Sequence, residues 1–201
     1  MLDARDITFG YGKQTIYQGF NLSVAPGERV ALSAPSGFGK TSLCRILAGY
    51  EQPWKGEVLV DGAPLPKGGA CPVQLIIQNP DTAVDPRLRM SKTLAEAGDV
   101  PERIIEGLGL REMWFSRFPH ELSGGELQRF CIARALAAAP RYLIADEIST
   151  MLDVVTQAQI WRFLLEECER ANMGLVFVSH SPALTRKIAT RVIDLRECAV
   201  S

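Results

Sequence analysis

Residues 34–41 read APSGFGKT, which differs at one position from the phosphate-binding pattern G-x-x-x-x-G-K-[ST]. The apolar segment 29–33 precedes this loop, and an amphipathic pattern over 40–48 follows it and ends at Gly49. The order predicts a strand, a glycine-rich turn and a helix, with Gly49 just past the helix end. Backbone N–H groups of such a turn, beside the positive end of a helix, can bind phosphate groups.

The residues of this loop have distinct expected roles. The Lys40 ammonium is expected to reach the β- and γ-phosphates of a nucleotide, and the Thr41 hydroxyl to bind magnesium. Ala34 stands where the pattern has glycine, but a residue before Pro35 favours an extended backbone that alanine adopts readily, so the change should be tolerated. The nucleotide-binding residues predicted from this segment are Ala34, Pro35, Ser36, Gly37, Phe38, Gly39, Lys40, Thr41 and Ser42.

Outward from the loop, strand and helix patterns alternate along most of the chain. Short β-branched or apolar runs predict strands at 7–9, 20–24, 29–33, 57–60, 73–78, 142–146, 175–180 and 191–195. Helical spacing predicts helices over 40–48, 93–96, 102–110, 126–139, 156–170 and 184–189. The charged segment 79–121 has little strand pattern and is expected to form a small helical insert. The alternation elsewhere predicts an α/β fold whose parallel sheet is covered on both faces.

The composition is that of one globular domain. With 201 residues, 47% hydrophobic and 22% charged, the chain is neither disordered nor of low complexity. Its 22 Lys and Arg against 23 Asp and Glu give a net charge of -1, which does not favour nucleic acid as a partner. No apolar run approaches the roughly 20 residues that cross a bilayer, and the acidic start is unlike a signal peptide, so we expect a cytosolic protein.

The cysteines fit a reducing compartment. They form no C-x-x-C pair and are too scattered for a disulfide framework or a zinc site. We expect all five to be small buried hydrophobic residues. They are Cys44, Cys71, Cys131, Cys168 and Cys198.

The segment 142–147, YLIADE, is an apolar strand pattern that ends in two carboxylates, Asp146 and Glu147. Open α/β sheets bind ligands at the C-terminal ends of their strands. We expect Asp146 to hold magnesium, directly or through water, and Glu147 to act as general base toward the attacking water. An Asp-Glu pair taken alone also fits a solvated turn, but its combination with a phosphate loop favours catalysis.

Residues 122–129 read LSGGELQR, and this string resembles the signature of ATP-binding cassette (ABC) ATPases. The order of the other motifs agrees with that family over nearly the whole chain: phosphate loop, glutamine after a strand, signature, acidic strand and histidine after a late strand. The resemblance implies a P-loop NTPase with a RecA-like core, a mainly parallel sheet, an N-terminal antiparallel β subdomain and a helical subdomain. It divides one domain, 1–201, into a core of 1–78 and 122–201 and a helical part of 79–121.

The resemblance also implies a head-to-tail dimer in which each ATP lies between the phosphate loop of one subunit and the signature of the other. Ser123, Gly124 and Gly125 would then contact the partner's ATP, although Ser123 and Glu126 also fit an ordinary capping box at the start of a helix. In the stretch 149–153, STMLD, the family resemblance implies that Asp153 crosses to the other subunit.

Three further residues match functional positions of the family. Tyr11 corresponds to the aromatic residue that stacks on adenine, although a buried core tyrosine is the alternative. Gln78 corresponds to the glutamine that contacts magnesium and water and links to the membrane subunit. His180 corresponds to the histidine that contacts the γ-phosphate. Ile148 stands where many relatives have proline, which we interpret as a neutral variation.

The stretches QNPDTAVDPRLRM and PHELSGGELQR resemble the ATPases of oligopeptide, dipeptide and nickel importers. This likeness implies ATP and Mg²⁺ as ligands, a second ABC ATPase, transmembrane permease subunits and an extracytoplasmic substrate-binding protein as partners, and a place at the cytoplasmic face of the membrane. Nickel, a metal chelate and a short peptide remain open as substrates, and so do a homodimer and a heterodimer. The alternatives are a soluble ABC ATPase of DNA repair or ribosomes and a subunit that hydrolyses little ATP.

Overall fold

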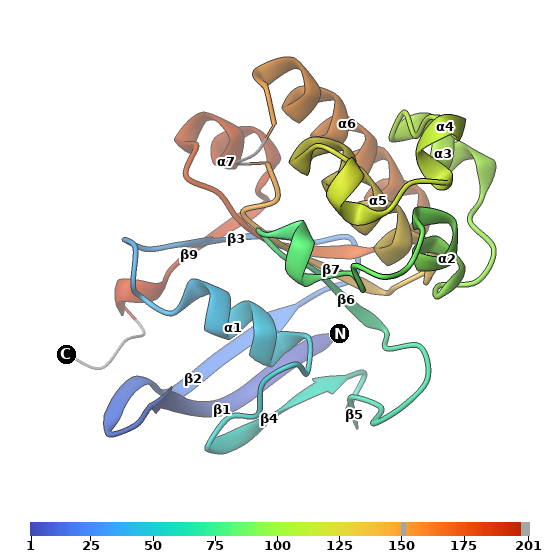
Figure 1. The fold of residues 1–201 in the computed structure, drawn as a ribbon. Helices are drawn as coiled ribbons and strands as arrows, with labels where there is room; N and C mark the ends of the chain where they lie inside the picture. Colours follow the sequence, from blue (N-terminus) through green and yellow to red (C-terminus); the bar gives the residue numbers. More distant parts are fainter. Residues whose placement is uncertain (150–151, 198–201) are drawn as a thin grey trace.

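The computed structural model describes residues 1–149 and 152–197 of the chain and contains two β-sheets (Figure 1). All neighbouring strands of the five-stranded sheet are parallel, in the order β6-β7-β8-β3-β9. These strands are β6 Val73–Ile76, β7 Tyr142–Asp146, β8 Gly174–Val178, β3 Arg29–Ser33 and β9 Arg191–Asp194. The segments that follow β3, β6, β7 and β8 therefore leave the sheet at one common edge.

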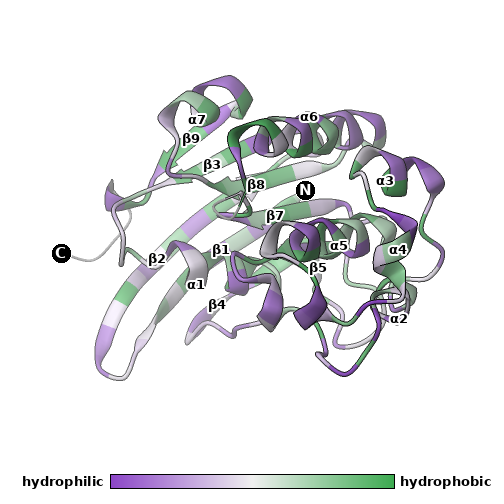
Figure 2. Ribbon diagram, turned by 45° about the horizontal axis from the view of Figure 1, so that its top comes forward, coloured by the Kyte–Doolittle hydropathy of each residue, from purple (hydrophilic) through white to green (hydrophobic). Residues whose placement is uncertain are grey.

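The parallel sheet is covered on both faces, as its alternating pattern predicts. Leu143, Ala145 and Phe177 face a core formed with α5 Gly124–Ala137, α6 Val154–Ala171 and α7 Pro182–Ile188. Tyr142 and Ile144 face the opposite core, which includes α1 Lys40–Leu47 and the second sheet. Figure 2 shows hydrophobic residues along β7 and β8 and hydrophilic ones on the outer turns of the helices. Apolar burial on both sides is the main term that stabilises such a sheet.

The second sheet is antiparallel, in the order β2-β1-β4-β5. Its strands are β1 Leu2–Tyr11, β2 Gln14–Val24, β4 Lys55–Val60 and β5 Ala63–Pro64. The predicted strand at 7–9 was too short because Asp6 has a φ of 50° and interrupts the pairing of β1 with a bulge, which breaks the apolar alternation. The predicted turn at Asp61 and Gly62 is confirmed, with positive φ at both residues.

The segment 79–121 contains only short helices among its described elements: η1 Pro80–Thr82, α2 Met90–Ala95, α3 Glu102–Gly107, α4 Glu112–Phe115 and η2 Pro119–Glu121. The helical character is confirmed, but the predicted 102–110 helix ends early because the chain turns at Gly109, whose φ is 60°. The sequence pattern also missed α4, whose four residues hold a single buried side chain, Trp114.

The later helices each begin two residues before their predicted starts. Helix α5 begins two residues before the predicted start, because Ser123 caps it, and it ends where Ala139 takes a φ of 48°. Cys44, Cys131 and Cys168 are buried as predicted, whereas Cys71 is partly exposed and Cys198 lies outside the described residues. Within the described ranges, no helix has the length and apolar character needed to cross a membrane.

Candidate nucleotide site

The segment 34–41 forms a tight loop between β3 and α1, with its backbone shaped by two glycines. Gly37 and Gly39 have φ values of 85° and 73°, which side chains other than glycine rarely adopt. Ala34 is not among the described residues with positive φ, so alanine is compatible with this backbone, as predicted. The Lys40 ammonium donates to the carbonyls of Ala34 and Pro35 at 2.9 and 3.0 Å. These contacts place the Lys40 charge within the loop that would receive phosphate.

Tyr17 packs beneath the same loop and donates a hydrogen bond to it, a contact that the sequence analysis did not predict. Its fully buried ring lies in β2, and its hydroxyl donates to the Phe38 carbonyl at 2.8 Å. A Cβ atom at Gly39 would lie 2.7 Å from the Ile16 side chain and 3.2 Å from the Tyr17 ring. Glycine at 39 is therefore required both by its backbone conformation and by the close packing of β2. Tyrosine in an apolar strand usually reports packing alone, so no sequence signal marked this contact.

Asp146 ends β7 in the interior, next to the start of α1. Its side chain is 2% exposed, it accepts a hydrogen bond from the Thr41 hydroxyl, and its Oδ1 atom has no hydrogen-bond partner. Burial raises the pKa of Asp146 above its ordinary value, and the Thr41 hydrogen bond opposes that rise. A buried carboxylate oxygen without a partner beside a hydroxyl fits Mg²⁺, which takes few ligands from protein and others from phosphate and water.

Glu147 follows directly and has its carboxylate fixed at both oxygens. The Gln78 amide donates to Oε2 at 2.9 Å, and His180 Nε2 lies 2.8 Å from Oε1. The backbone φ of Glu147 is 50°, in the left-handed region. A proline at 148 would push the preceding residue away from helical conformations, so the buried Ile148 is compatible with this backbone. The three residues predicted to be catalytic are thus in direct contact.

A cavity of about 640 Å³ opens beside these groups. Its lining brings together predicted residues from five segments of the chain: Tyr11, Ser36, Gly37, Gly39, Lys40, Thr41, Ser42, Gln78, Glu147 and His180. Tyr11 is 53% exposed, which excludes the core alternative, and its hydroxyl lies 3.0 Å from Ser42 Oγ. An exposed aromatic face tethered beside a phosphate loop can stack on a planar base.

The signature residues do not belong to this cavity in the described part of the chain. Ser123 and Glu126 form the predicted capping box of α5, with Ser123 N–H donating to Glu126 at 2.8 Å. Gly124 and Gly125 occupy the first turn of that helix. Asp153 is exposed and accepts from the N–H groups of Val155 and Thr156 as the N-cap of α6. Thr150 and Met151 of the STMLD stretch lie outside the described residues.

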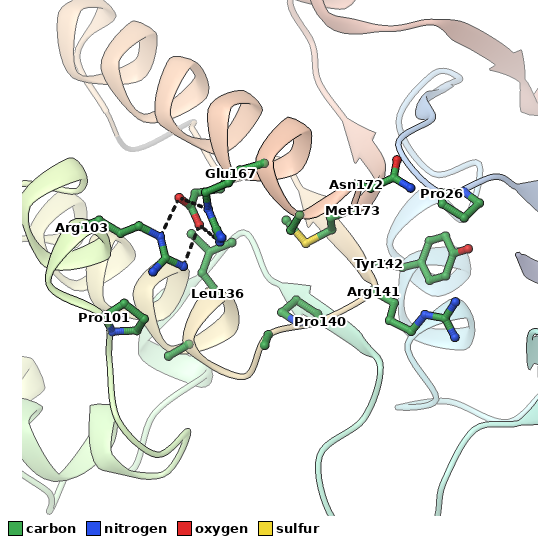
Figure 3. Close-up of a pocket in the computed structure, with 14 residues that line it drawn as sticks. Pro26, Pro101, Arg103, Leu136, Pro140, Arg141, Tyr142, Glu167, Asn172 and Met173 are labelled. Carbon is green, nitrogen blue, oxygen red and sulfur yellow. Dashed lines mark hydrogen bonds and ion pairs between the residues drawn. The ribbon is translucent and has the colours of Figure 1, made fainter.

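A second cavity, of about 480 Å³, lies near the opposite ends of the strands, where β7 begins (Figure 3). Its dominant polar feature is the Glu167 carboxylate, which accepts from Arg103 of α3 and from Arg170 of α6. The two arginines outweigh the effect of burial and lower the pKa of Glu167. This cluster joins the helical segment to the core, and it contains no group that could carry out phosphoryl transfer.

The family model described as ABC transporter matches residues 17–150. The nickel import ATP-binding protein NikE of Rhodospirillum rubrum is 35% identical, over 92% of this chain and 73% of that protein. The Fe(3+) ions import ATP-binding protein FbpC of Mesorhizobium japonicum is 34% identical over 98% of this chain, which spans 58% of that relative's length. The glutathione import ATP-binding protein GsiA of Pectobacterium atrosepticum is 36% identical over 83% of this chain and 30% of the length of GsiA.

Solved structures agree with the sequence comparison. The dimeric structure of a bacterial ABC transporter cassette has a TM-score of 0.82 and 25% sequence identity, with 96% of this chain and 94% of the other covered. The two folds therefore correspond over almost their full length.

Proposed function

The chain belongs to the ABC transporter family, and from this premise we propose that it is the ATP-hydrolysing subunit of an importer, bound at the cytoplasmic face of a membrane. The observation that carries this proposal is the direct contact of Glu147 with Gln78 and His180 at the mouth of the phosphate loop. ATP would place its adenine against Tyr11 and its phosphates in the 34–42 loop, with Lys40 leaving the loop carbonyls for the β- and γ-phosphates.

Thr41, Asp146 and Gln78 are the residues proposed to hold Mg²⁺, which neutralises charge on the β- and γ-phosphates when bound. The buried Asp146 oxygen without a partner supports this assignment. In the hydrolysis step the Glu147 carboxylate takes a proton from water as the water oxygen bonds to the γ-phosphorus. The bond from that phosphorus to the bridging oxygen breaks, and ADP keeps the electron pair. His180 and Gln78 orient the carboxylate.

The second nucleotide contact would come from another ABC ATPase. Helix α5 begins with Ser123, Gly124 and Gly125, which do not line the cavity described above. N–H groups at the start of a helix bind anions. We propose that they contact ATP held by the partner subunit, with Asp153 at the same interface. ATP would then close the dimer because it binds both surfaces, and hydrolysis would release it.

The permease would dock in a groove between the parallel sheet and the helical segment. A cavity of about 680 Å³ lies there, lined among others by Ile77, Ala83, Glu96, Cys131 and Arg134. Ile77, Ala83 and Glu96 directly follow β6, η1 and α2, and the other two residues lie on α5. A membrane subunit seated in the groove would therefore touch the segment that carries Gln78. We accordingly propose 1–78 with 122–201 as the core and 79–121 as the helical subdomain.

The relatives named as import proteins favour an importer over a soluble ATPase of DNA repair or ribosomes. Their names cover nickel, Fe(3+) ions and glutathione, so a metal ion, a metal chelate and a short peptide are all proposed substrate classes. Selection among them would belong to the permease and to an extracytoplasmic substrate-binding protein.

Light scattering of Glu147→Gln with and without Mg-ATP tests the proposal, together with phosphate release by the unmutated chain. We expect ATP hydrolysis by the unmutated chain, none by the variant, and an ATP-dependent dimer of the variant. A variant that binds ATP but stays monomeric would point to a non-identical partner or to assembly on the permease. Undiminished hydrolysis by Glu147→Gln would remove this residue from the role of base.

A further inference from the structure

One face of α5 is bonded to the chain segment that carries Gln78. Three side chains, spaced three residues apart on the helix, donate to three backbone carbonyls with the same spacing. The pairs are Gln128 with Ile77 at 3.3 Å, Cys131 with Pro80 at 3.9 Å and Arg134 with Ala83 at 2.5 Å. Residues separated by three positions lie on the same side of a helix, so the segment follows α5 for two turns. Figure 1 shows α5 beside the chain between β6 and α2.

We propose that Gln128 is a positioning residue for ATP hydrolysis, an inference that rests on the proposed function. Gln128 is 1% exposed, and its amide nitrogen holds the carbonyl of Ile77. The next residue, Gln78, donates from its own amide to Glu147 Oε2 at 2.9 Å. Gln128 therefore fixes the backbone from which the Gln78 side chain reaches the general base. It touches neither substrate nor the reacting atoms.

The surroundings of Gln128 separate this role from a purely structural one. Only the nitrogen of its amide is used, because Oε1 is buried and has no hydrogen-bond partner. A buried acceptor without a partner costs stability, and this cost offsets the gain from the hydrogen bond to Ile77. Methionine has nearly the same length and no polar atom to satisfy. Replacement of Gln128 by methionine should consequently leave folding unchanged while the Ile77 carbonyl loses its donor.

Helix α5 also links two parts of the proposed site. The helix begins at Ser123, in the turn proposed to contact the partner's ATP, and the second turn of the helix holds the Gln78 segment.

Gln128→Met tests the inference, measured as ATP turnover against ATP concentration and as thermal unfolding. We expect kcat to fall about tenfold, KM for ATP to stay within about twofold, and the melting temperature to be unchanged. Gln74→Met is the matched control, because Gln74 likewise donates its amide to a backbone carbonyl, that of Cys71 at 3.1 Å, without contacting the Gln78 segment through this bond. This control should keep the unmutated kcat.

A double-mutant cycle with Gln78→Ala identifies the route. If Gln128 acts through Gln78, the methionine variant lowers kcat in the native background and has no further effect once Gln78 is alanine. The inference would be overturned if Gln128→Met lowered kcat by the same factor whether residue 78 is glutamine or alanine. It would also be overturned by an unchanged kcat or by a Gln128→Met chain that fails to fold. Failure of the proposed function would show differently, as an absence of ATP hydrolysis in the unmutated chain.

Discussion

The Nε2 atom of His180 lies 2.8 Å from Oε1 of Glu147, while the other oxygen of this carboxylate accepts from Gln78. The two contacts come from segments that follow β8 and β6, on either side of β7. A carboxylate held at both oxygens has a fixed orientation, and a general base needs such an orientation toward the proton it removes.

Removal of the His180 ring should therefore lower turnover more than nucleotide binding. We expect His180→Ala to reduce kcat about 100-fold, because Glu147 loses an orienting contact at Oε1, with a small change in ATP affinity. His180→Gln keeps an N–H donor near the same place and should recover part of the loss. Steady-state kinetics of both variants test this prediction. An equal decrease in kcat for the two variants would mean that the hydrogen bond to Glu147 is not the relevant feature of His180.

Lys40 is predicted to contribute strongly to nucleotide affinity. Its ammonium already lies within the loop, where it donates to two carbonyls, and hydrogen bonds from a charged donor are each worth about 1.5–3 kcal/mol. Lys40→Ala should weaken Mg-ATP binding about 100-fold in calorimetric titration. The exposed Lys67 provides the control, since Lys67→Ala removes the same charge far along the chain. Retention of unmutated affinity by Lys40→Ala would contradict the assignment of the loop.

Tyr17 is predicted to act on ATP binding through the loop backbone. Tyr17→Phe removes the hydroxyl that donates to the Phe38 carbonyl and leaves the ring packed below Gly39. Loss of one neutral hydrogen bond costs about 1 kcal/mol, so the ATP KM should rise about fivefold with kcat nearly constant. Tyr50→Phe, at a side chain that is 71% exposed, should change neither constant. A fall in kcat at constant KM would place Tyr17 in catalysis instead.

Tyr17 also marks the limit of sequence-based inference for this protein. Motifs such as APSGFGKT and LSGGELQR depend on local spacing, so they predicted the loop, the acidic strand and the candidate residues Gln78, Glu147 and His180. The structure then showed that Glu147 contacts the other two. Contacts made by ordinary core residues carry no such spacing. No motif assigned a role to Tyr17 or Gln128, and only the fold brings them to the loop and to Ile77.

Some elements of the fold were likewise predictable from the sequence and others were not. Strand β3, β7 and the crossover helices followed from apolar periodicity, whereas β1 was missed over most of its length because the bulge at Asp6 shifts the alternation. In the helical segment, α4 is too short to show a period. Bulges and single-turn helices are fixed by tertiary contacts, which a pattern in one sequence does not contain.

The Asp146 carboxylate is expected to lower the stability of the ligand-free fold while it supports Mg-dependent ATP hydrolysis. Burial raises the pKa of its carboxyl, so the charged form destabilises the fold at every pH above that pKa. Asp146→Asn removes the charge and is expected to stabilise the ligand-free protein by about 1 kcal/mol at pH 7, while Mg-dependent ATP hydrolysis is lost. The gain should shrink as pH falls through the raised folded-state pKa and vanish below the ordinary value of 3.8, where the carboxyl is neutral in both the folded and the unfolded state. Denaturant unfolding at pH 7 and pH 4 measures both effects, and a less stable Asn variant at pH 7 would contradict them.

Glu167 should have the opposite effect on stability. Burial alone would raise its pKa, but Arg170 and Arg103 outweigh it and lower the pKa below the ordinary value of 4.5. The charged form therefore stabilises the fold above pH 4.5, and this contribution is lost as pH falls through the folded-state pKa. Glu167→Gln is expected to lower the unfolding free energy by about 2 kcal/mol at pH 7, less than for a fully buried pair because both arginines are about half exposed.

The neighbouring residue supplies the control for that prediction. Glu166 pairs with Arg162 one helical turn away, and both side chains are more than half exposed, so Glu166→Gln should change stability by less than about 0.5 kcal/mol. Urea unfolding of the two variants and the unmutated chain at pH 7 and pH 4 separates the effects. The Glu167 difference should shrink at the lower pH because part of the Glu167 carboxyl population is then protonated in the unfolded state. Equal effects of the two substitutions at pH 7 would mean that the cluster between α3 and α6 does not join the helical segment to the core.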